Sequence, residues 1–455
     1  MASQPQRPLW GSRVREPLSE LALTLSGSTD VDRPLASYDV LASRAHVDQL
    51  ASLGLIDAEG RARLDTVLGA IAEAIEGGTF AWNDAHEDVH MNVEAAVREA
   101  VGPELAGQLQ AGRSRNEEVV TDERLWLLDA VRRLDDALLR LQEVLVGRAE
   151  EHVETILPAH THTQPAQPTL LAHHLLAYVE MLQRDRGRLR DAAERADVSP
   201  AGSGAAVGSG LPIDRDAVAH RMGFSSISAN SLDAVADRDY AAEVVSACAI
   251  ALLHLSRLAA DLVGWSTPYY RFARIGDGYA TGSSMLPNKR NPDVAELIRG
   301  RGASTQGDLL AVIAVQGGLP LGYHRDLQET RGPMQRTVAS LELCAAAMTE
   351  MLGGVTFDPD AMVAAATGGH ALSTALAERL VRAGVPFRDA HWRVGELVSR
   401  AEEAGCDLGD LPVDELREAL PELAASDPIM PTLAEAVASA DLPGGTAPNR
   451  VRAAL

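Results

Sequence analysis

The amino-acid sequence predicts an all-α fold: a central bundle of long helices flanked by smaller helical N- and C-terminal domains. Hydrophobic residues make up 46% of the 455-residue chain, but aromatic residues only 4%. Apolar and polar residues hardly ever alternate with the two-residue period of strands. Several long stretches instead carry apolar residues at three- and four-residue steps, which is the period of a helix face.

The longest helical pattern covers residues 117–155, where proline is absent and glycine occurs only at Gly147. Its apolar stripe consists of Leu125, Leu128, Val131, Leu134, Leu138, Leu141 and Val144. Further long helices are expected over residues 169–196, 231–265, 293–317 and 333–352. Helices of this length bury their apolar stripes by packing along one another, so a central bundle is expected.

Polar segments rich in glycine or proline separate the predicted long helices and should lie at the ends of the bundle or in a lid. They cover residues 112–116, 157–168, 198–212, 276–292 and 317–333. We therefore expect an N-terminal helical domain over residues 1–112 and a C-terminal helical domain over 363–455. The bundle should occupy residues 113–362, with an unusual loop at 278–293.

Charge and composition restrict the class of protein. A formal net charge of −23 argues against nucleic acid or an anionic membrane surface as partner. The most apolar stretch, residues 244–256, is too short to span a bilayer. The N-terminus has no apolar core of signal-peptide length. The three cysteines lie far apart, as expected for buried thiols in a reducing compartment. A cytoplasmic protein is expected.

The segment 281–293 contains the most unusual combination of polar groups. It holds the hydroxyls of Ser283 and Ser284, the cation Lys289 between the amides of Asn288 and Asn291, and two prolines. A hydroxyl beside an ammonium group and amide donors is suited to binding an oxyanion. A polar surface loop is the alternative.

The segment 160–168 offers two histidines, His160 and His162. A two-histidine metal site is conceivable, but no cysteine or further histidine with ligand spacing completes it. Proton transfer or hydrogen bonding is favoured, because the pKa of histidine lies near neutral pH. His173 and His174 lie in an apolar helix and are expected to be structural.

Two further segments suit an anionic ligand. Arg115 and Asn116 begin the longest helix, where arginine and amide donors can bind carboxylate or phosphate. Residues 322–331 gather a phenol, an amide and two guanidinium groups, at Tyr323, Gln328, Arg325 and Arg331. Taken alone, either segment is also compatible with an ordinary polar loop.

Together these segments resemble a known family. The 281–293 loop resembles the mobile signature loop of the fumarase/aspartase superfamily, Gly-Ser-Ser-x-x-Pro-x-Lys-x-Asn-Pro. Within it, the chain is similar to the argininosuccinate lyases nearly end to end. The similar segments are Leu9 to Arg13, Arg33 to Asp39, Glu87 to His90, Gly112 to Asn116, Thr161 to Gln164, Asn230 to Asp239, Leu319 to Glu329, Gly384 to His391 and Gly444 to Pro448.

The resemblance implies a carbon–nitrogen lyase that converts argininosuccinate reversibly into L-arginine and fumarate, the last step of arginine biosynthesis. It implies no cofactor and no metal. It also implies a homotetramer whose bundles pack into a twenty-helix core, with each active site built from three subunits.

The resemblance also implies residue roles. Ser283 corresponds to the serine that removes the Cβ proton, and His162 to a histidine of acid–base or substrate-holding function. Lys289 corresponds to a catalytic group beside the substrate carboxylate, and Glu296 to the acidic partner of the histidine. The implied substrate-binding residues are Ser28, Arg115, Asn116, Thr161, Asn291, Tyr323, Gln328 and Arg331. Because serine is a weak base, we expect Lys289 and the helix start at Asp293 to lower its pKa.

Some positions depart from the family pattern. The usual Gln-Glu-Asp-Lys is Gln-Glu-Thr-Arg here, ending at Arg331, and His324 replaces a common asparagine. The loop reads Leu-Pro-Asn-Lys-Arg at 286–290 instead of the usual Met-Pro-Gln-Lys-Lys, and its Lys-Arg-Asn-Pro run at 289–292 is similar to that of adenylosuccinate lyase. A different N-substituted aspartate, such as an adenylosuccinate-like or specialised-metabolism substrate, is therefore an alternative.

A second alternative is a non-catalytic structural protein, like the family members that serve as lens crystallins, or a helical scaffold for binding partners. The presence of Ser283, His162, Lys289 and Asn291 argues against a structural role. Four separate polar clusters are also more than a scaffold requires. The sequence therefore favours an enzyme.

Overall fold

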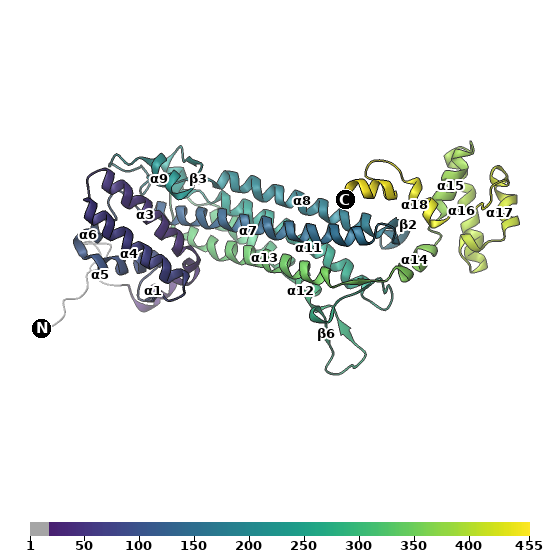
Figure 1. Ribbon diagram of the computed structural model, residues 1–455, viewed down its shortest axis with the longest axis horizontal. Coiled ribbons are helices and arrows are strands. Elements are labelled where there is room, and N and C mark those ends of the chain that lie inside the picture. Colours follow the sequence, from purple (N-terminus) through teal and green to yellow (C-terminus); the bar gives the residue numbers. More distant parts are fainter. Residues whose placement is uncertain (1–17) are drawn as a thin grey trace. The chain divides into compact units, whose positions relative to one another are not determined.

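The structure is a computed structural model that describes residues 18–455. Helices dominate it, and the described strands form only two-stranded sheets (Figure 1). The predicted all-α class is confirmed. The similar segment from Leu9 to Arg13 lies outside the described residues.

The described chain forms two compact units. Unit 1 contains the described residues up to Arg133, together with Leu189–Ser246 and Gly307–Val338. Unit 2 contains Leu134–Arg188, Ala247–Gln306 and Ala339–Leu455. The expected division into three domains, at residues 112 and 362, stays a prediction.

Five long helices each have one segment in unit 1 and one segment in unit 2 (Figure 1). Most of their bounds lie close to the predicted ones. They are α7 (Arg115–Glu151), α8 (Leu171–Ala196), α11 (Asp239–Trp265), α12 (Asp293–Gln316) and α13 (Arg331–Gly353). The predicted helix 231–265 is interrupted, because Asp237 has an extended backbone between α10 (Ser231–Ala236) and α11. Along α7 the predicted stripe is buried from Leu125 to Leu141 except at Leu128, which is partly buried.

Helix α11 extends well beyond the apolar stretch at residues 244–256. By length and composition alone, this 27-residue helix could cross a membrane. However, 56% of its most apolar window is buried inside the protein. Burial of this kind is typical of a core helix, whose apolar residues pack against neighbouring helices.

Unit 1 contains a group of shorter helices near the N-terminus. They are α1 (Glu20–Ser26), α2 (Thr29–Asp32), α3 (Ala36–Ser52), α4 (Ala58–Glu76), α5 (Val89–Val101) and α6 (Pro103–Gln108), with the 3₁₀ turn η1 (Arg33–Leu35). Their core includes Leu50, Leu64, Leu68 and Val97. The Asp57 and Asp88 side chains accept hydrogen bonds from the first turns of α4 and α5, which defines where these helices begin.

Unit 1 also contains the connections between the long helices. These are β3 (Val198–Ser199), α9 (Arg215–Met222), β4 (Ser226–Ile227) and the 3₁₀ helix η3 (Arg325–Thr330). Strands β3 and β4 pair in parallel. Helix α9 ends at Gly223, whose φ of 94° is the left-handed conformation that glycine adopts without steric cost.

In unit 2, the expected polar interruption at 157–168 is an antiparallel hairpin. Strands β1 (Ile156–Thr161) and β2 (Gln164–Leu170) are joined by His162 and Thr163, with φ of 54° and 60°. Two left-handed residues at this position are typical of a type I′ turn, for which Asn-Gly is the usual sequence. A β-branched residue such as Thr163 is strained there. Such strain is often found at functional sites.

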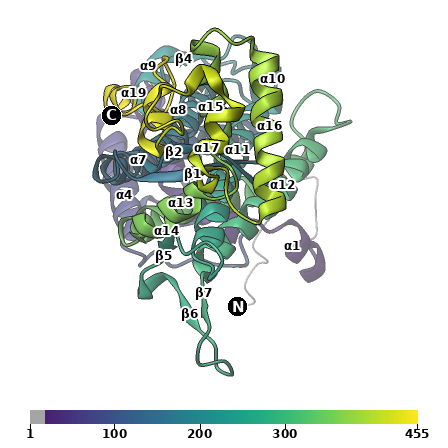
Figure 2. The same cartoon turned by 90° about the vertical axis from the view of Figure 1, so that its right-hand side faces the viewer.

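The rest of unit 2 consists of short strands and the C-terminal helices. Strands β5 (Ala273–Arg274) and β8 (Thr356–Phe357) pair, as do β6 (Thr281–Gly282) and β7 (Arg290–Asn291), and the 3₁₀ turn η2 spans Asp277–Tyr279. The helices are α14 (Pro359–Thr367), α15 (Ser373–Arg382), α16 (Phe387–Ala404), α17 (Val413–Ala419), α18 (Leu433–Ser439) and α19 (Pro448–Ala454), with the turns η4 (Leu408–Asp410) and η5 (Pro421–Leu423). Helices α15, α16 and α17 lie close together (Figure 2). They share a core that includes Leu376, Leu380, Leu397 and Leu416.

Helix α16 provides a test of this C-terminal core. Leu397 is 1% exposed, so Leu397→Ala should leave a cavity and lower the free energy of unfolding by about 2–5 kcal/mol. Trp392 lies on the same helix but is 69% exposed, and Trp392→Ala should change the free energy by less than about 0.5 kcal/mol. Urea unfolding of both variants measures the difference. Equal losses in the two variants would contradict the assignment of Leu397 to the core.

Candidate active site

The predicted site residues fall into two groups, one in each unit. Unit 2 contains the loop residues Ser283, Lys289 and Asn291, the helix residue Glu296, and the hairpin residues Thr161 and His162. Unit 1 contains Ser28, Arg115, Asn116, Tyr323, Gln328 and Arg331. Each group is described by itself.

The signature loop connects β6 to β7 and projects away from the helices of unit 2 (Figures 1 and 2). Its base is held by side-chain contacts. Arg290 forms an ion pair with Asp277, and the Thr281 hydroxyl donates a hydrogen bond to Asp293 at the start of α12. The loop is therefore anchored at both ends, while most of its residues between the strands are exposed.

Ser283 lies at the start of a tight turn within this loop. Its Oγ accepts hydrogen bonds from the backbone N–H of Leu286 at 3.0 Å and of Met285 at 3.3 Å. Two N–H donors directed at one hydroxyl oxygen would stabilise negative charge on it, as an oxyanion hole does. The loop backbone thus supplies what a serine base requires, independently of the lysine that the sequence suggested for this task.

The other loop groups are accessible. Lys289 is exposed, and within the described part of the chain it forms no ion pair. Asn291 lies in β7 and is half-buried, and Glu296 in the first turn of α12 is exposed beside Arg299 at 4.0 Å. Lys289 is therefore free to meet an anion.

A cavity of about 680 Å³ lies at the base of the loop. Arg290 and Asn291 border it from the loop, and Arg271 and Arg274 from the segment that follows α11. Thr356 and Asp358 also line it. Three guanidinium groups around one cavity make it a local anion-compatible region in a protein with a net charge of −23.

The hairpin tip presents Thr161 and His162 to solvent. Among the described residues, no hydrogen bond or ion pair holds the imidazole of His162, and the Thr163 hydroxyl donates only to the His162 carbonyl. A strained, exposed histidine with an unoccupied ring is available for a ligand or for another chain. No hydrogen bond connects this tip with the signature loop in the described residues.

In unit 1, Ser28 is part of a buried chain of polar contacts. Its hydroxyl donates to Asp32 Oδ2 at 2.5 Å, and Asp32 Oδ1 accepts from Arg331 Nη1 at 2.5 Å. Arg331 Nε donates to Glu123 Oε1 at 2.6 Å. Arg331 is only 2% exposed, so its guanidinium lies inside the protein. The assignment of Arg331 as a substrate-binding residue stays a prediction.

Glu123 is held from its other side as well. Its Oε2 accepts from the Tyr240 hydroxyl at 2.5 Å and lies 3.1 Å from Arg238 Nε. Burial raises the pKa of Glu123, but Arg238 and Arg331 outweigh burial and lower it. The guanidinium of Arg238 also lies 5.9 Å from the centre of the Tyr323 ring. The ring of this predicted substrate-binding residue is thus next to the buried cluster.

The remaining predicted residues of unit 1 are bound to its loops. Arg115 donates to Asp88 at 3.0 Å, and Asn116 donates to the Ala205 carbonyl at 3.0 Å. The Gln328 amide lies 3.5 Å from the Ser26 carbonyl, which places η3 against the segment that carries Ser28. The Arg115 and Asn116 side chains are half-buried at the start of α7, where N–H groups and positive charge favour anions.

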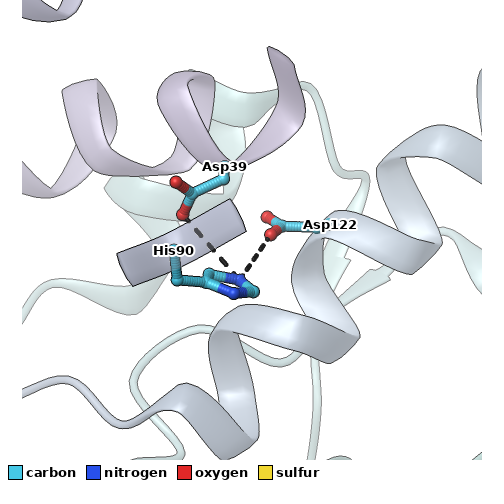
Figure 3. Close-up of side chains that lie close together, drawn as sticks. All are labelled: Asp39, His90 and Asp122. Carbon is cyan, nitrogen blue, oxygen red and sulfur yellow. Dashed lines mark hydrogen bonds and ion pairs between the residues drawn. The ribbon is translucent and has the colours of Figure 1, made fainter. Parts of the chain in front are cut away.

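Figure 3 shows a fully buried cluster of Asp39, His90 and Asp122 from α3, α5 and α7. His90 Nε2 lies 3.0 Å from Asp122 and 4.0 Å from Asp39, and Nδ1 lies 3.7 Å from Asp88. Burial alone would lower the pKa of His90, but these carboxylates raise it well above its usual value. Burial raises the pKa of Asp122.

The same cluster has the composition of a metal site. Its ligand atoms lie within 4.8 Å of one another, and one imidazole with two carboxylates suits a divalent ion. However, the hydrogen bond between His90 and Asp122 occupies the atoms that would bind the metal. The proton on His90 also supplies the positive charge that a metal would bring. We therefore interpret the cluster as a structural charge network. Asp88 connects it to Arg115, because Asp88 lies near His90 and accepts a hydrogen bond from Arg115.

Sequence reasoning missed several residues of these networks. Asp32, Glu123 and Arg238 carry no local signal, because their partners lie up to 299 residues away in the chain. His90 belongs to a segment that matched the family pattern, but its role was not predicted. A charged residue within an apolar helix face, as at Glu123 of α7, is the kind of signal that indicates a buried partner.

The His90 cluster makes a pH-dependent prediction. His90→Gln removes the charge that offsets Asp39, Asp88 and Asp122, and should lower the free energy of unfolding by about 3–5 kcal/mol near neutral pH. The pKa of His90 is raised by folding, so its stabilisation is complete below about pH 6.5 and is lost as the pH rises through the folded-state pKa. The difference between wild type and variant should therefore shrink at alkaline pH.

Urea unfolding between pH 6 and pH 10 measures this difference. The exposed His220 on α9 provides the control, since His220→Gln should show a small difference at every pH. A His90→Gln difference that grows towards alkaline pH would contradict the charged state assigned to His90.

Comparison with known proteins places this geometry in a family. Residues 13–307 match the family described as Lyase, and residues 370–438 match the family described as Argininosuccinate lyase C-terminal. The argininosuccinate lyase of Thiobacillus denitrificans is 43% identical over 454 residues, covering 100% of this chain and 98% of the relative. That of Hyphomonas neptunium is 46% identical over 418 residues, covering 92% and 90%.

Solved structures agree on the fold. EDDS lyase in complex with formate is similar with a TM-score of 0.82 and 27% identity, covering 95% of this chain and 87% of that one. The class II fumarase of Schistosoma mansoni has a TM-score of 0.74 and 16% identity, covering 89% and 91%, which supports the fold alone. By its length of similarity and its level of identity, the chain belongs to the argininosuccinate lyase family within the fumarase/aspartase superfamily.

Proposed function

We propose that this protein is an argininosuccinate lyase, which converts argininosuccinate reversibly into L-arginine and fumarate in arginine biosynthesis. The observation that carries the proposal is identity of 43–46% to argininosuccinate lyases along nearly the whole chain. The predicted catalytic residues Ser283, His162, Lys289 and Glu296 are all present. A cytoplasmic location is part of the proposal, and it is supported by three free cysteines.

In the proposed reaction, Ser283 Oγ removes the proton from Cβ of the succinyl group. The backbone N–H groups of Met285 and Leu286 stabilise the alkoxide that acts as base. The electron pair left on Cβ spreads into the neighbouring carboxylate and then forms the Cα–Cβ double bond. The Cα–N bond breaks with its electron pair on nitrogen. The departing guanidine takes up one proton and becomes the guanidinium of arginine, and Ser283 gives up the proton taken from Cβ, so that the site returns to its starting state with no net change in protons.

The developing charge on the succinyl carboxylates requires cations and donors in fixed positions. Lys289 is exposed and without an ion pair among the described residues, so its ammonium is available for this charge. Asn291, two residues before the start of α12 at Asp293, adds an amide donor. Closure of the projecting loop over the substrate would exclude water and strengthen these interactions. His162 is assigned to acid–base work or to holding the substrate.

We also propose that the protein is a homotetramer whose active sites combine residues of several subunits. His162 and Ser283 lie on exposed tips that no described contact joins. Large apolar side chains are exposed along the long helices, which a monomer in water would not favour. They are Leu253 on α11, Leu297, Leu310 and Ile313 on α12, and Leu343 on α13. A second copy of the chain covers such faces in a symmetric assembly.

A second candidate function is cleavage of another N-substituted aspartate with release of fumarate. The similarity to EDDS lyase supports it, since that enzyme has the same fold at 27% identity and one of its variants was solved with bound fumarate. The changes at His324 and Arg331 favour altered recognition of the leaving group. The chemistry at Ser283 would be the same in both candidates.

Fumarate release distinguishes the candidates, and Ser283→Ala tests the mechanism. Purified wild-type protein should release fumarate, followed by its ultraviolet absorbance, from argininosuccinate but not from adenylosuccinate or aspartate. Ser283→Ala should lower kcat at least a hundredfold, since removing a general base costs about 10²–10⁴-fold. Ser399→Ala on α16 makes the same chemical change away from the loop and should retain activity.

Two outcomes would contradict these assignments. Near-normal turnover by Ser283→Ala would remove Ser283 from the role of base. Absence of release from argininosuccinate by a folded wild-type protein would favour the second candidate function.

Mixing variants tests the shared active site. Ser283→Ala and His162→Asn should each be inactive alone. If the two residues meet at sites shared between subunits, hybrid tetramers formed by partial denaturation and refolding should regain part of the activity. The fumarate assay on the mixture measures this recovery, with each variant refolded alone as control. A mixture as inactive as its components would contradict sharing of the site.

A further inference from the structure

The direction of the hydrogen bonds around Ser28 is fixed by the buried cluster behind it. Arginine offers only donors, so Arg331 Nη1 donates to Asp32 Oδ1. The Asp32 carboxylate, in an ion pair with Arg331, accepts on both oxygens. The contact between Ser28 Oγ and Asp32 Oδ2, at 2.5 Å, therefore uses the hydroxyl proton of Ser28. What remains on Ser28 Oγ is a pair of acceptor sites.

The cluster is also electrically balanced. Arg331 and Arg238 face Asp32 and Glu123, and each of the four side chains is at most 3% exposed. Burial opposes the charge of Arg331, but Glu123 and Asp32 outweigh burial and raise its pKa. With two positive and two negative charges, the cluster presents no net charge towards Ser28. Ser28 is 4% exposed, so the contact that it offers a ligand is a hydrogen bond to its hydroxyl oxygen, with little further surface.

We propose that Asp32, Arg331 and Glu123 are positioning residues that make Ser28 a hydrogen-bond acceptor, so that Ser28 recognises an N–H group of the substrate. This inference rests on the proposed function, in which Ser28 contacts argininosuccinate. That molecule offers N–H donors only on its guanidinium and ammonium groups. Its carboxylates offer acceptors only and would face the lone pairs of Ser28 unfavourably.

Glu123 is included because it holds the guanidinium of Arg331 in place. Arg331 donates through Nε to Glu123 and through Nη1 to Asp32. Glu123 is itself fixed by the Tyr240 hydroxyl and Arg238. A guanidinium donates from two nitrogens in one plane, and an ammonium is a compact charge on a flexible stem that cannot reproduce this arrangement. Arg331 thus acts on the substrate through Asp32 and Ser28.

Asp32→Asn reverses the polarity while keeping the shape of the side chain. Its amide oxygen must accept from Arg331, because the NH₂ group would meet another donor there. The NH₂ group therefore faces Ser28 and donates to it. The hydroxyl proton of Ser28 then points towards the substrate, and Ser28 becomes a donor.

The test measures how strongly each product, L-arginine or fumarate, inhibits the cleavage of argininosuccinate as a competitive inhibitor at a low substrate concentration. L-Arginine carries N–H donors and fumarate carries none. In Asp32→Asn, the inhibition constant of arginine should rise about 10- to 100-fold, as for loss of a hydrogen bond to a charged group. That of fumarate should stay within about twofold, and the KM for argininosuccinate should rise more than kcat falls.

Matched variants separate this role from simple damage. Ser28→Ala leaves the charged cluster intact and should show the same split between arginine and fumarate, even if Asp32→Asn fails to fold. The double variant should be no weaker for arginine than Ser28→Ala alone, since both changes act on one contact. Arg336→Lys, on the exposed face of the same helix α13, should leave both constants unchanged, whereas Arg331→Lys should weaken arginine.

The outcomes distinguish this inference from the proposed function. If wild type cleaves argininosuccinate but Ser28→Ala and Asp32→Asn weaken arginine and fumarate equally, or weaken fumarate alone, the acceptor role of Ser28 is wrong. Unchanged constants in both variants would also overturn it. If wild type cleaves no argininosuccinate and binds neither product by calorimetry, the proposed function fails and this inference fails with it.

Discussion

The buried guanidinium of Arg331 is the constraint on which unit 1 depends. A charge without water is tolerated only when opposite charges and hydrogen bonds surround it, and removing one partner is strongly destabilising. Its partners Asp32 and Glu123 come from α2 and α7, and Arg238 precedes α11. The registers of these segments are therefore coupled, since a shift of one helix would leave a buried charge unpaired. The position of Ser28 follows from the same requirement.

The two groups of candidate residues have opposite physical characters. In unit 1 the candidate binding residue Ser28 rests on a buried network of ion pairs and hydrogen bonds, which restricts its position. In unit 2, Ser283 lies on a projecting loop and His162 on a strained hairpin tip, both accessible to solvent. Substrate binding requires hydrogen-bonding groups in fixed orientations, whereas the chemical step requires a loop that admits substrate and then closes. The fold separates these requirements between core and loops.

The sequence predicted the long helices within a few residues except at the start of α11, because their apolar period and their glycine and proline boundaries are local signals. The β1–β2 hairpin was missed, since a polar segment with three prolines has no strand-like alternation. In the site, the loop motif made Ser283 a candidate, and its role stays a prediction. The N–H groups of Met285 and Leu286 that point at its hydroxyl oxygen are backbone geometry that residue types do not encode. The partners of Arg331 could not be predicted, because they are distant in the chain.

Position and environment lead to different roles for Arg331. Its place in the family pattern suggests a cation that meets the substrate, because a lysine is usual there. Its surroundings in this chain suggest another task, since Glu123 and Asp32 occupy two of its nitrogens and water hardly reaches it. A lysine could neutralise one of these carboxylates but could not hold both in one plane. Arginine in place of lysine therefore fits the two buried partners Asp32 and Glu123. Under the role proposed for Ser28, this exchange would replace a charge facing the substrate by a hydrogen bond from the substrate to the Ser28 hydroxyl.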